Sequence, residues 1–233
     1  MIDCMVSPFV LRKEIVEYGQ RIYEKNFVAG TDGNISCRLS DGEFLITPSG
    51  MAKGRMNPDD LVVIDADGNL TGGKNKPSSE FKLHTFIYSK RSDVDTIIHA
   101  HPVFCTAFAC TENGFAQNIL PEIVVTAGGI PLAEYGTPST AELPESIAGL
   151  ITEHDTILLQ NHGIVTVGRN LEEAYIKLET AEHFAKILHA AQDLGGAKPL
   201  SRAAVDKLME IKEQLNPNAS DPGFIPSRRE KEE

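Results

Sequence analysis

Apolar residues at helical spacing predict six helices. The first starts at Ser7-Pro8, a capping hydroxyl followed by proline at the first helical position, and apolar residues recur on one face through Ile22. The later helices are expected to span about Ser78–Lys90, Pro102–Cys110, Pro138–Glu153, Leu171–Leu194 and Arg202–Leu215. Gly195-Gly196 directly follows the expected helix Leu171–Leu194 and is a typical signal for a helix C-terminus.

Short β-rich runs between the helices predict six strands. The runs are Phe44–Thr47, Leu61–Asp65, Val94–Ala100, Ile123–Thr126, Thr156–Gln160 and Ile164–Val167. Asp67-Gly68 follows the second run and is a strong hairpin-turn signal. Strands and helices mixed in this order favour one α/β domain around a single mixed or antiparallel sheet.

The domain is expected to cover residues 1–215. We find no internal repeat, low-complexity tract or convincing linker before residue 196. Residues 216–233 contain three prolines and a charged end, which is typical of a tail that is ordered only when something docks it.

Charge and composition narrow the class of partner. The chain of 233 residues has 22 basic and 33 acidic residues, so its net charge is 22 − 33 = −11. That balance argues against nucleic acid and against membrane surfaces as partners, because both are polyanionic. It leaves room for a small anionic substrate, which needs only a few local donors. The absence of Trp also argues against a base-stacking platform.

Other features of the sequence indicate a cytoplasmic protein. The first twenty residues lack a basic segment followed by an apolar run, so we expect no signal peptide. No stretch of 18 apolar residues occurs that could span a membrane. The four cysteines form no C-x-x-C pair and are interpreted as reduced thiols rather than a disulfide framework or zinc site.

Three histidines and one glutamate carry a candidate metal site. His99 and His101 stand two apart at the end of a predicted strand, so both imidazoles point to the same face, about 7 Å apart along the strand. His162 lies in a tight turn between two apolar strands, and Glu80 comes at the start of a predicted helix. Three imidazoles and a carboxylate form a zinc-like catalytic set with a position left for substrate.

Each of these residues also has a plainer interpretation. Histidines near strand ends often satisfy loop hydrogen bonds. A carboxylate at position 80 can cap a helix or interact favourably with the helix dipole. The four together favour the metal site over these separate structural roles.

Three short segments supply groups that suit a phosphate monoester. Each segment alone is more often a turn or a helix cap. Ser78-Ser79 adjoins Glu80 at a helix N-terminus, where the dipole favours negative charge, so phosphate and metal are expected in one cleft. The candidate phosphate-binding residues are Gly33, Asn34, Ser49, Gly50, Ser78 and Ser79.

Together these motifs resemble the class II aldolase/adducin-head family, which includes L-fuculose-1-phosphate aldolases and L-ribulose-5-phosphate 4-epimerases. The resemblance covers about residues 7–194, with G-T-D-G-N-I-S, L-I-T-P-S-G, K-P-S-S-E, H-A-H-P and Q-N-H-G in the family's order. It implies a three-layer α/β/α domain with a mainly antiparallel sheet. It further implies a homotetramer with active sites at the subunit interfaces.

The resemblance also implies roles for individual residues. His99, His101 and His162 would hold a divalent metal, usually Zn²⁺, with Mn²⁺ or Co²⁺ as alternatives. Glu80 would be a metal-adjacent acid/base, and the six residues named above would bind the phosphate of a sugar substrate. The implied reaction is reversible aldol cleavage of a ketose 1-phosphate to dihydroxyacetone phosphate and a small aldehyde.

Tyr135 is the candidate for a further catalytic role. The segment Gly129–Tyr135 resembles the stretch with which the aldolases send a tyrosine across the subunit interface as a proton donor. A packed loop tyrosine is the alternative. The aldolases' second functional tyrosine near the C-terminus has no counterpart, because no tyrosine follows Tyr175, and Phe224 cannot donate a proton.

Rival functions stay open at this point. A 4-epimerase and a methylthioribulose-1-phosphate dehydratase need the same metal triad. A non-catalytic interaction module like the adducin head would have lost the ligands, whereas all four residues are present. A cupin-type dioxygenase also uses H-x-H, but its glutamate is missing here, since the next glutamate after His101 is Glu112.

Overall fold

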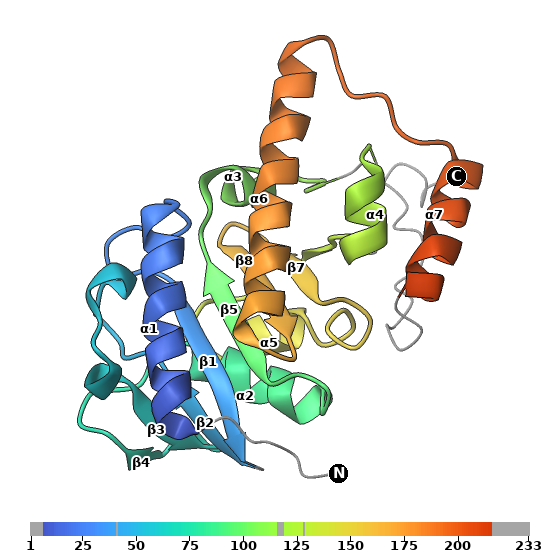
Figure 1. Cartoon of the computed structure of the whole chain (residues 1–233). Coiled ribbons are helices and arrows are strands. Elements are labelled where there is room, and N and C mark those ends of the chain that lie inside the picture. The colour runs from blue at the N-terminus through green and yellow to red at the C-terminus, as the bar shows by residue number, and fades with distance from the viewer. Residues whose placement is uncertain (1–6, 41, 116–118, 128, 216–233) are drawn as a thin grey trace.

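The structure is a computed structural model that describes residues 7–40, 42–115, 119–127 and 129–215. One eight-stranded sheet runs through it in the order β4-β3-β2-β1-β5-β8-β7-β6 (Figure 1). Every neighbouring pair is antiparallel except β6–β7, which is parallel. The strands are β1 (Asn34–Ser40), β2 (Glu43–Ile46), β3 (Val62–Asp65), β4 (Leu70–Gly72), β5 (Thr96–Ala100), β6 (Leu132–Ala133), β7 (Thr156–Leu159) and β8 (Gly163–Gly168).

Helices cover both faces of this sheet and produce the expected three-layer α/β/α fold. Figure 1 shows α1 and α6 side by side on the near face, with α2 and α5 behind the sheet. Successive residues of β5 alternate between the two hydrophobic cores, Ile97 on one face and Ile98 on the other. The helices are α1 (Pro8–Glu24), α2 (Phe81–Lys90), α3 (Val103–Ala109), α4 (Pro121–Ala127), α5 (Glu142–Ser146), α6 (Leu171–Asp193) and α7 (Arg202–Leu215).

Two predicted elements were wrong. The expected strand at Ile123–Thr126 is part of helix α4, which starts at Pro121 and packs against α6 and α7. Proline at the first helical position followed by Glu122 is a helix start, and it outweighs the β-branched run that follows.

The helix expected at Pro138–Glu153 shrinks to the five residues of α5. Residues 137–140 form a turn closed by the Thr140 N–H bond to the Thr137 carbonyl, and Ser139 has a φ of 65°. Pro144 is compatible only with the first turn of a helix, so α5 starts just before it. Hydrogen-bonded turns, not regular helix, follow through Glu153.

Strand β1 was not predicted, although it lies in the centre of the sheet between β2 and β5. Its buried apolar positions are Ile35 and Cys37, and they alternate with the buried polar residues Asn34 and Ser36. Two polar side chains in a central strand conceal its hydrophobic pattern. Both have partners in the candidate site described below.

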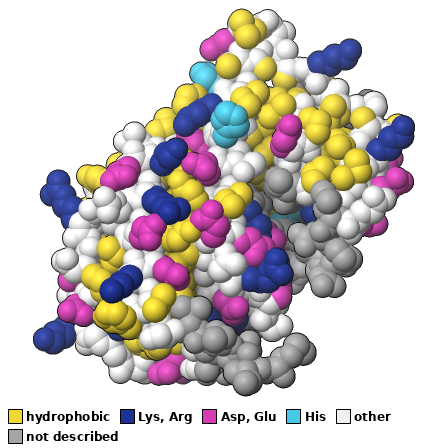
Figure 2. Space-filling model, in the orientation of Figure 1, with side chains coloured by type: hydrophobic (Ala, Val, Ile, Leu, Met, Phe, Trp, Pro, Cys, Tyr) yellow, Lys and Arg dark blue, Asp and Glu magenta, His cyan; other side chains and the backbone are white. Residues whose placement is uncertain are grey.

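On the face that Figure 2 shows, acidic and basic side chains are interspersed, and the coloured side chains form no continuous basic patch. Within the described ranges, no helix combines the length and the apolar character needed to cross a membrane. The predicted tail, residues 216–233, lies outside the described residues.

Candidate metal and anion site

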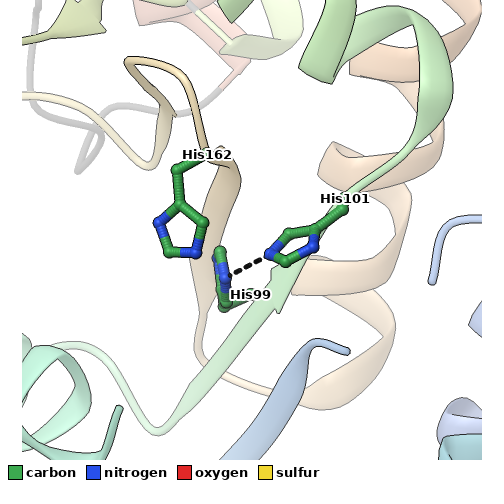
Figure 3. A group of neighbouring side chains, drawn as sticks. All are labelled: His99, His101 and His162. Carbon is green, nitrogen blue, oxygen red and sulfur yellow. Dashed lines mark hydrogen bonds between the residues drawn. The ribbon is translucent and has the colours of Figure 1, made fainter. Parts of the chain in front are cut away.

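The three histidines predicted to bind a metal come together at one end of the sheet (Figure 3). His99 is in β5 and His101 directly follows that strand, while His162 lies in the β7–β8 turn. One nitrogen from each ring lies within 4.8 Å of the others. The Nε2 atoms of His99 and His101 are 2.9 Å apart. Antiparallel pairing of β5 with β8 brings these distant segments together.

Hydrogen bonding fixes the tautomer of His99 for metal binding. Its Nδ1 lies 3.0 Å from the Ile164 carbonyl, which can only accept, so Nδ1 carries the proton. Nε2 therefore presents a lone pair to the centre of the cluster. This is the arrangement of a metal-binding histidine whose other nitrogen is bound to the protein. The donor set thus fits a divalent cation with nitrogen preference, such as Zn²⁺.

Glu80 is the carboxylate next to this cluster. Its Oε2 lies 3.2 Å from His99 Nε2 and its Oε1 lies 3.3 Å from His162 Nε2. Oε1 is buried and has no hydrogen-bond partner among the described residues. Glu80 is the N-cap residue of α2, but its side chain makes no capping hydrogen bond. The capping alternative therefore does not describe Glu80, whose carboxylate turns to the histidines instead.

Burial shifts the pKa values in the direction that metal binding and proton transfer require. It lowers the pKa of His162 to about 4 and holds the pKa of His99 well below its usual range. Both imidazoles are therefore neutral at pH 7, as metal ligands must be. Burial also raises the pKa of Glu80, although the hydrogen bond from Asn34 opposes this shift. A carboxylate with a raised pKa suits proton transfer near neutral pH.

Gly163 allows His101 and the β7–β8 turn to approach each other. A Cβ at this position would lie 2.5 Å from the Ala100 carbonyl oxygen and 2.6 Å from His101 Cδ2. The left-handed residue of the turn is Asn161, with a φ of 54°. A residue without a Cβ at position 163 thus permits the close packing of the two segments that carry the candidate ligands His101 and His162.

Replacing Gly163 by alanine is expected to weaken Zn²⁺ binding by about 10-fold or more and to lower the free energy of unfolding by about 1–3 kcal/mol. The added methyl group must push His101 or the β5 backbone away. Calorimetric zinc titration and thermal unfolding measure the two effects. Gly149→Ala is the matched control, because a Cβ there meets nothing within 4 Å. Equal zinc affinity in the two variants would contradict the packing argument.

A cavity of about 340 Å³ lies beside the histidines. It is lined by Glu80, His101, His162 and all six residues predicted to bind phosphate: Gly33, Asn34, Ser49, Gly50, Ser78 and Ser79. Backbone hydrogen bonds join the predicted segments, from Ser49 N to the Lys76 carbonyl and from Ser78 N to the Thr47 carbonyl. The fold therefore brings the candidate anion-binding residues into one cavity with the candidate metal ligands.

A chain of buried hydrogen bonds runs from α2 through β1 to Glu80. Asn34 Nδ2 donates to Glu80 Oε2 at 2.8 Å, and the amide oxygen of Asn34 is bonded to His84 Nε2. That oxygen only accepts, so His84 carries its proton on Nε2, and its Nδ1 accepts from Ser36 Oγ at 2.6 Å. Tyr88 then donates to Ser36 at 2.8 Å. His84 thus orients Asn34.

Other lining residues were missed. Asp32, Lys53, Pro138 and Ser139 also border the cavity. Asp32 belongs to the G-T-D-G-N-I-S motif, but no pattern in the sequence marks this aspartate as a site residue. Pro138 and Ser139 were assigned to a helix, so their turn could not be placed.

Tyr135 is not among the residues that line this cavity. Its side chain is exposed, and its backbone N–H donates to Gln160 Oε1 at 3.1 Å. The role of the Tyr135 side chain as a proton donor to a neighbouring subunit's site stays a prediction.

Comparisons with known proteins agree with this geometry. A 3-oxo-tetronate 4-phosphate decarboxylase of Haemophilus influenzae is 33% identical over 78% of this chain and 88% of its own. An L-fuculose phosphate aldolase of Methanococcus maripaludis is 35% identical over 74% of this chain and 93% of its own. A solved structure of an L-fuculose 1-phosphate aldolase has a TM-score of 0.79 and 33% identity, covering 87% of this chain and 95% of its own.

The family model for the class II aldolase and adducin N-terminal domain matches residues 13–189. This range includes all three histidines, Glu80 and the six residues predicted to bind phosphate. The three-histidine cluster is consistent with a divalent metal site. The chain belongs to the class II aldolase and adducin N-terminal domain family.

Proposed function

We propose that this protein catalyses reversible, metal-dependent aldol cleavage of a ketose 1-phosphate to dihydroxyacetone phosphate and a small aldehyde. The observation that carries the proposal is the cavity lined together by the six residues predicted to bind phosphate, Glu80, His101 and His162. An anion held there lies next to a carboxylate with a raised pKa. The similarity to L-fuculose phosphate aldolases supports the same reaction.

Three histidines and Glu80 define the chemistry. His99, His101 and His162 would hold the divalent metal, Zn²⁺ or in its place Mn²⁺ or Co²⁺. When bound, such an ion supplies Lewis-acid stabilisation of the enediolate charge that forms as the C3–C4 bond breaks. Glu80 delivers a proton to C3 of the enediolate in cleavage and removes it in condensation. Asn34 holds the Glu80 carboxylate in place through its 2.8 Å hydrogen bond.

A second candidate is decarboxylation of a 3-oxo acid phosphate, the reaction named for the Haemophilus influenzae relative. Loss of CO₂ from 3-oxo-tetronate 4-phosphate also leaves the enediolate of dihydroxyacetone phosphate, so the same site chemistry serves both. The decarboxylase substrate adds a carboxylate to a cavity that already holds Asp32 and Glu80. Like charges at short range disfavour that substrate relative to a neutral sugar tail, and this favours the aldolase. The 4-epimerase and the dehydratase remain rivals that use the same metal site.

We further propose that the protein acts as a cytoplasmic homotetramer. Tyr135 supports this assignment because its side chain is 55% exposed and lies outside the cavity of its own subunit. In the tetramer it would serve a neighbouring site as the proton donor to the aldehyde oxygen in condensation.

Product identification tests the proposed reaction. Zinc-, cobalt- or manganese-loaded protein is incubated with 1- and 5-phosphorylated pentuloses and hexuloses. Release of dihydroxyacetone phosphate together with lactaldehyde or glycolaldehyde supports the aldolase. Formation of an isomeric sugar phosphate without fragments would indicate the epimerase instead. Loss of water without carbon–carbon cleavage would indicate the dehydratase.

Replacing His84 by leucine is expected to lower kcat about 10- to 100-fold with the metal retained. Asn34 loses the partner of its amide oxygen and no longer holds Glu80. Because the Asn34 bond lowers the pKa of Glu80, its loss should raise that pKa. The acid limb of the pH–kcat profile for condensation, in which the ionised Glu80 removes the proton, should therefore move to higher pH. Steady-state kinetics across pH measure both effects.

Tyr88→Phe is the control, since it removes only the hydroxyl at the far end of the chain. It should leave the pH profile in place. An unchanged profile in the His84 variant would show that His84 only supports the fold.

A further inference from the structure

Lys53 is a buried lysine at the candidate anion site. Its side chain is 1% exposed, and its Nζ donates to the carbonyl oxygens of Thr31 at 2.9 Å and Met51 at 2.7 Å. Thr31 lies just before Gly33-Asn34, and Met51 lies just after Ser49-Gly50. One ammonium group therefore joins two of the three segments predicted to bind phosphate.

The ammonium group keeps donor capacity for a ligand. It has three N–H donors, and two of them bind backbone carbonyls. Within the described residues no carboxylate lies within ion-pair distance of Nζ. Among the described residues that line the cavity, Lys53 is the only lysine or arginine. A buried cation without a paired anion next to an open cavity points to an anionic ligand.

We propose that Lys53 is the cationic contact of the anion subsite and binds the phosphate group of the substrate. This inference rests on the proposed function for the identity of the phosphate ester. The other donors of the subsite, from Asn34, Ser49, Ser78 and Ser79, are neutral. Lys53 would supply the charge that distinguishes a phosphorylated sugar from its free form, because a charge-assisted hydrogen bond is about twice as strong as a neutral one.

The electrostatic surroundings agree with this role. Burial lowers the pKa of Lys53 to about 8, while Asp32 and Glu80 act in the opposite direction. The side chain is therefore mostly protonated at pH 7. A dianion beside it would offset the cost of holding a positive charge in a buried position.

Inorganic phosphate titrated calorimetrically into the metal-loaded protein tests the proposal without any turnover. Lys53→Met should weaken phosphate binding by about 10-fold or more. Lys74→Met is the control, since Lys74 is exposed and is not among the lining residues, and it should bind phosphate like the unaltered protein. Equal phosphate affinity in folded Lys53→Met would overturn the proposal.

Kinetics separate a phosphate contact from a loop tether. In Lys53→Met the KM for the phosphorylated ketose should rise at least about 10-fold with a smaller change in kcat, and kcat/KM should fall much less for the unphosphorylated ketose than for the phosphorylated one. Equal losses for both sugars would show that Lys53 only joins the two segments. If no cleavage of the ketose phosphate is detected while phosphate binding still depends on Lys53, the proposed reaction is wrong and the role of Lys53 in phosphate binding stands.

A measurement on the unaltered chain covers the case in which Lys53→Met does not fold. Burial slows hydrogen exchange of the Lys53 ammonium group, so its ¹⁵Nζ resonance is distinguishable from those of exposed lysines. Phosphate should shift this protected resonance. A protected resonance that phosphate leaves in place would overturn the proposal.

Discussion

Replacing Glu80 by glutamine is expected to lower the rate of carbon–carbon cleavage by about 100- to 10,000-fold while the metal stays bound. Glutamine has the shape of glutamate but cannot take up or deliver a proton at C3. The amide oxygen can still accept from Asn34, so the local structure should hold. The measurements are kcat for the phosphorylated ketose and metal content by elemental analysis.

Glu112→Gln serves as the matched control, because Glu112 is exposed. It should leave kcat unchanged. Undiminished cleavage by the metal-loaded Glu80 variant would remove Glu80 from the mechanism. A Glu80 variant that loses both metal and activity would show instead that the carboxylate acts as a ligand.

Removing the divalent metal is expected to abolish cleavage and to lower the melting temperature. A ligand that binds only the folded state stabilises it by about 2.7 kcal/mol at 100 times its Kd. Chelation followed by addition of Zn²⁺, Mn²⁺ or Co²⁺ should restore both properties. In His162→Ala, which lacks one of the three nitrogen ligands, the same addition should restore neither. Activity that survives chelation would exclude a required metal.

His183→Ala is the control for this loss, since His183 is exposed on α6. It should bind metal and cleave substrate like the unaltered protein. A loss of metal in this variant as well would show that the assay reports general damage to the fold.

Lowering the pH should destabilise the metal-free protein over a defined pH range. Burial lowers the pKa of His162 to about 4 in the folded state, whereas an unfolded histidine titrates near pH 6.5. The unfolded state therefore binds more protons as the pH falls from about 6.5 towards 4, and stability is lost over that range. Denaturant melts at several pH values measure the slope, and His162→Ala should reduce it.

The residues that come together at the candidate site were easier to identify from the sequence than the elements that position them. His99 and His101 share a strand face by simple alternation, and His162 sits in a tight turn recognisable from Asn-His-Gly between two apolar runs. Their meeting depends on the pairing of β5 with β8, which spacing alone does not determine. Strand β1 was missed because Asn34 and Ser36 replace apolar residues at buried positions and bind Glu80 and His84 instead.

Other elements were predicted that the structure does not contain, because local start signals and residue composition disagree there. The run Ile123–Thr126 is β-branched, yet Pro121-Glu122 starts a helix there. Pro138 resembles a helix start, but it lies in a turn in which Ser139 has a positive φ, and both residues line the cavity. Lys53 carries no motif at all, and only its hydrogen bonds to two separate loops reveal its position.

The reaction proposed for this site is cleavage of a ketose phosphate to dihydroxyacetone phosphate and an aldehyde. A direct comparison of kcat/KM for L-fuculose 1-phosphate and for 3-oxo-tetronate 4-phosphate, on the same zinc-loaded protein, tests it most directly. Both reactions release dihydroxyacetone phosphate, so the aldehyde and CO₂ are measured alongside it. We expect faster turnover of the ketose phosphate with one aldehyde per dihydroxyacetone phosphate. Faster turnover of the 3-oxo acid with stoichiometric CO₂ would show that the protein is a decarboxylase rather than an aldolase.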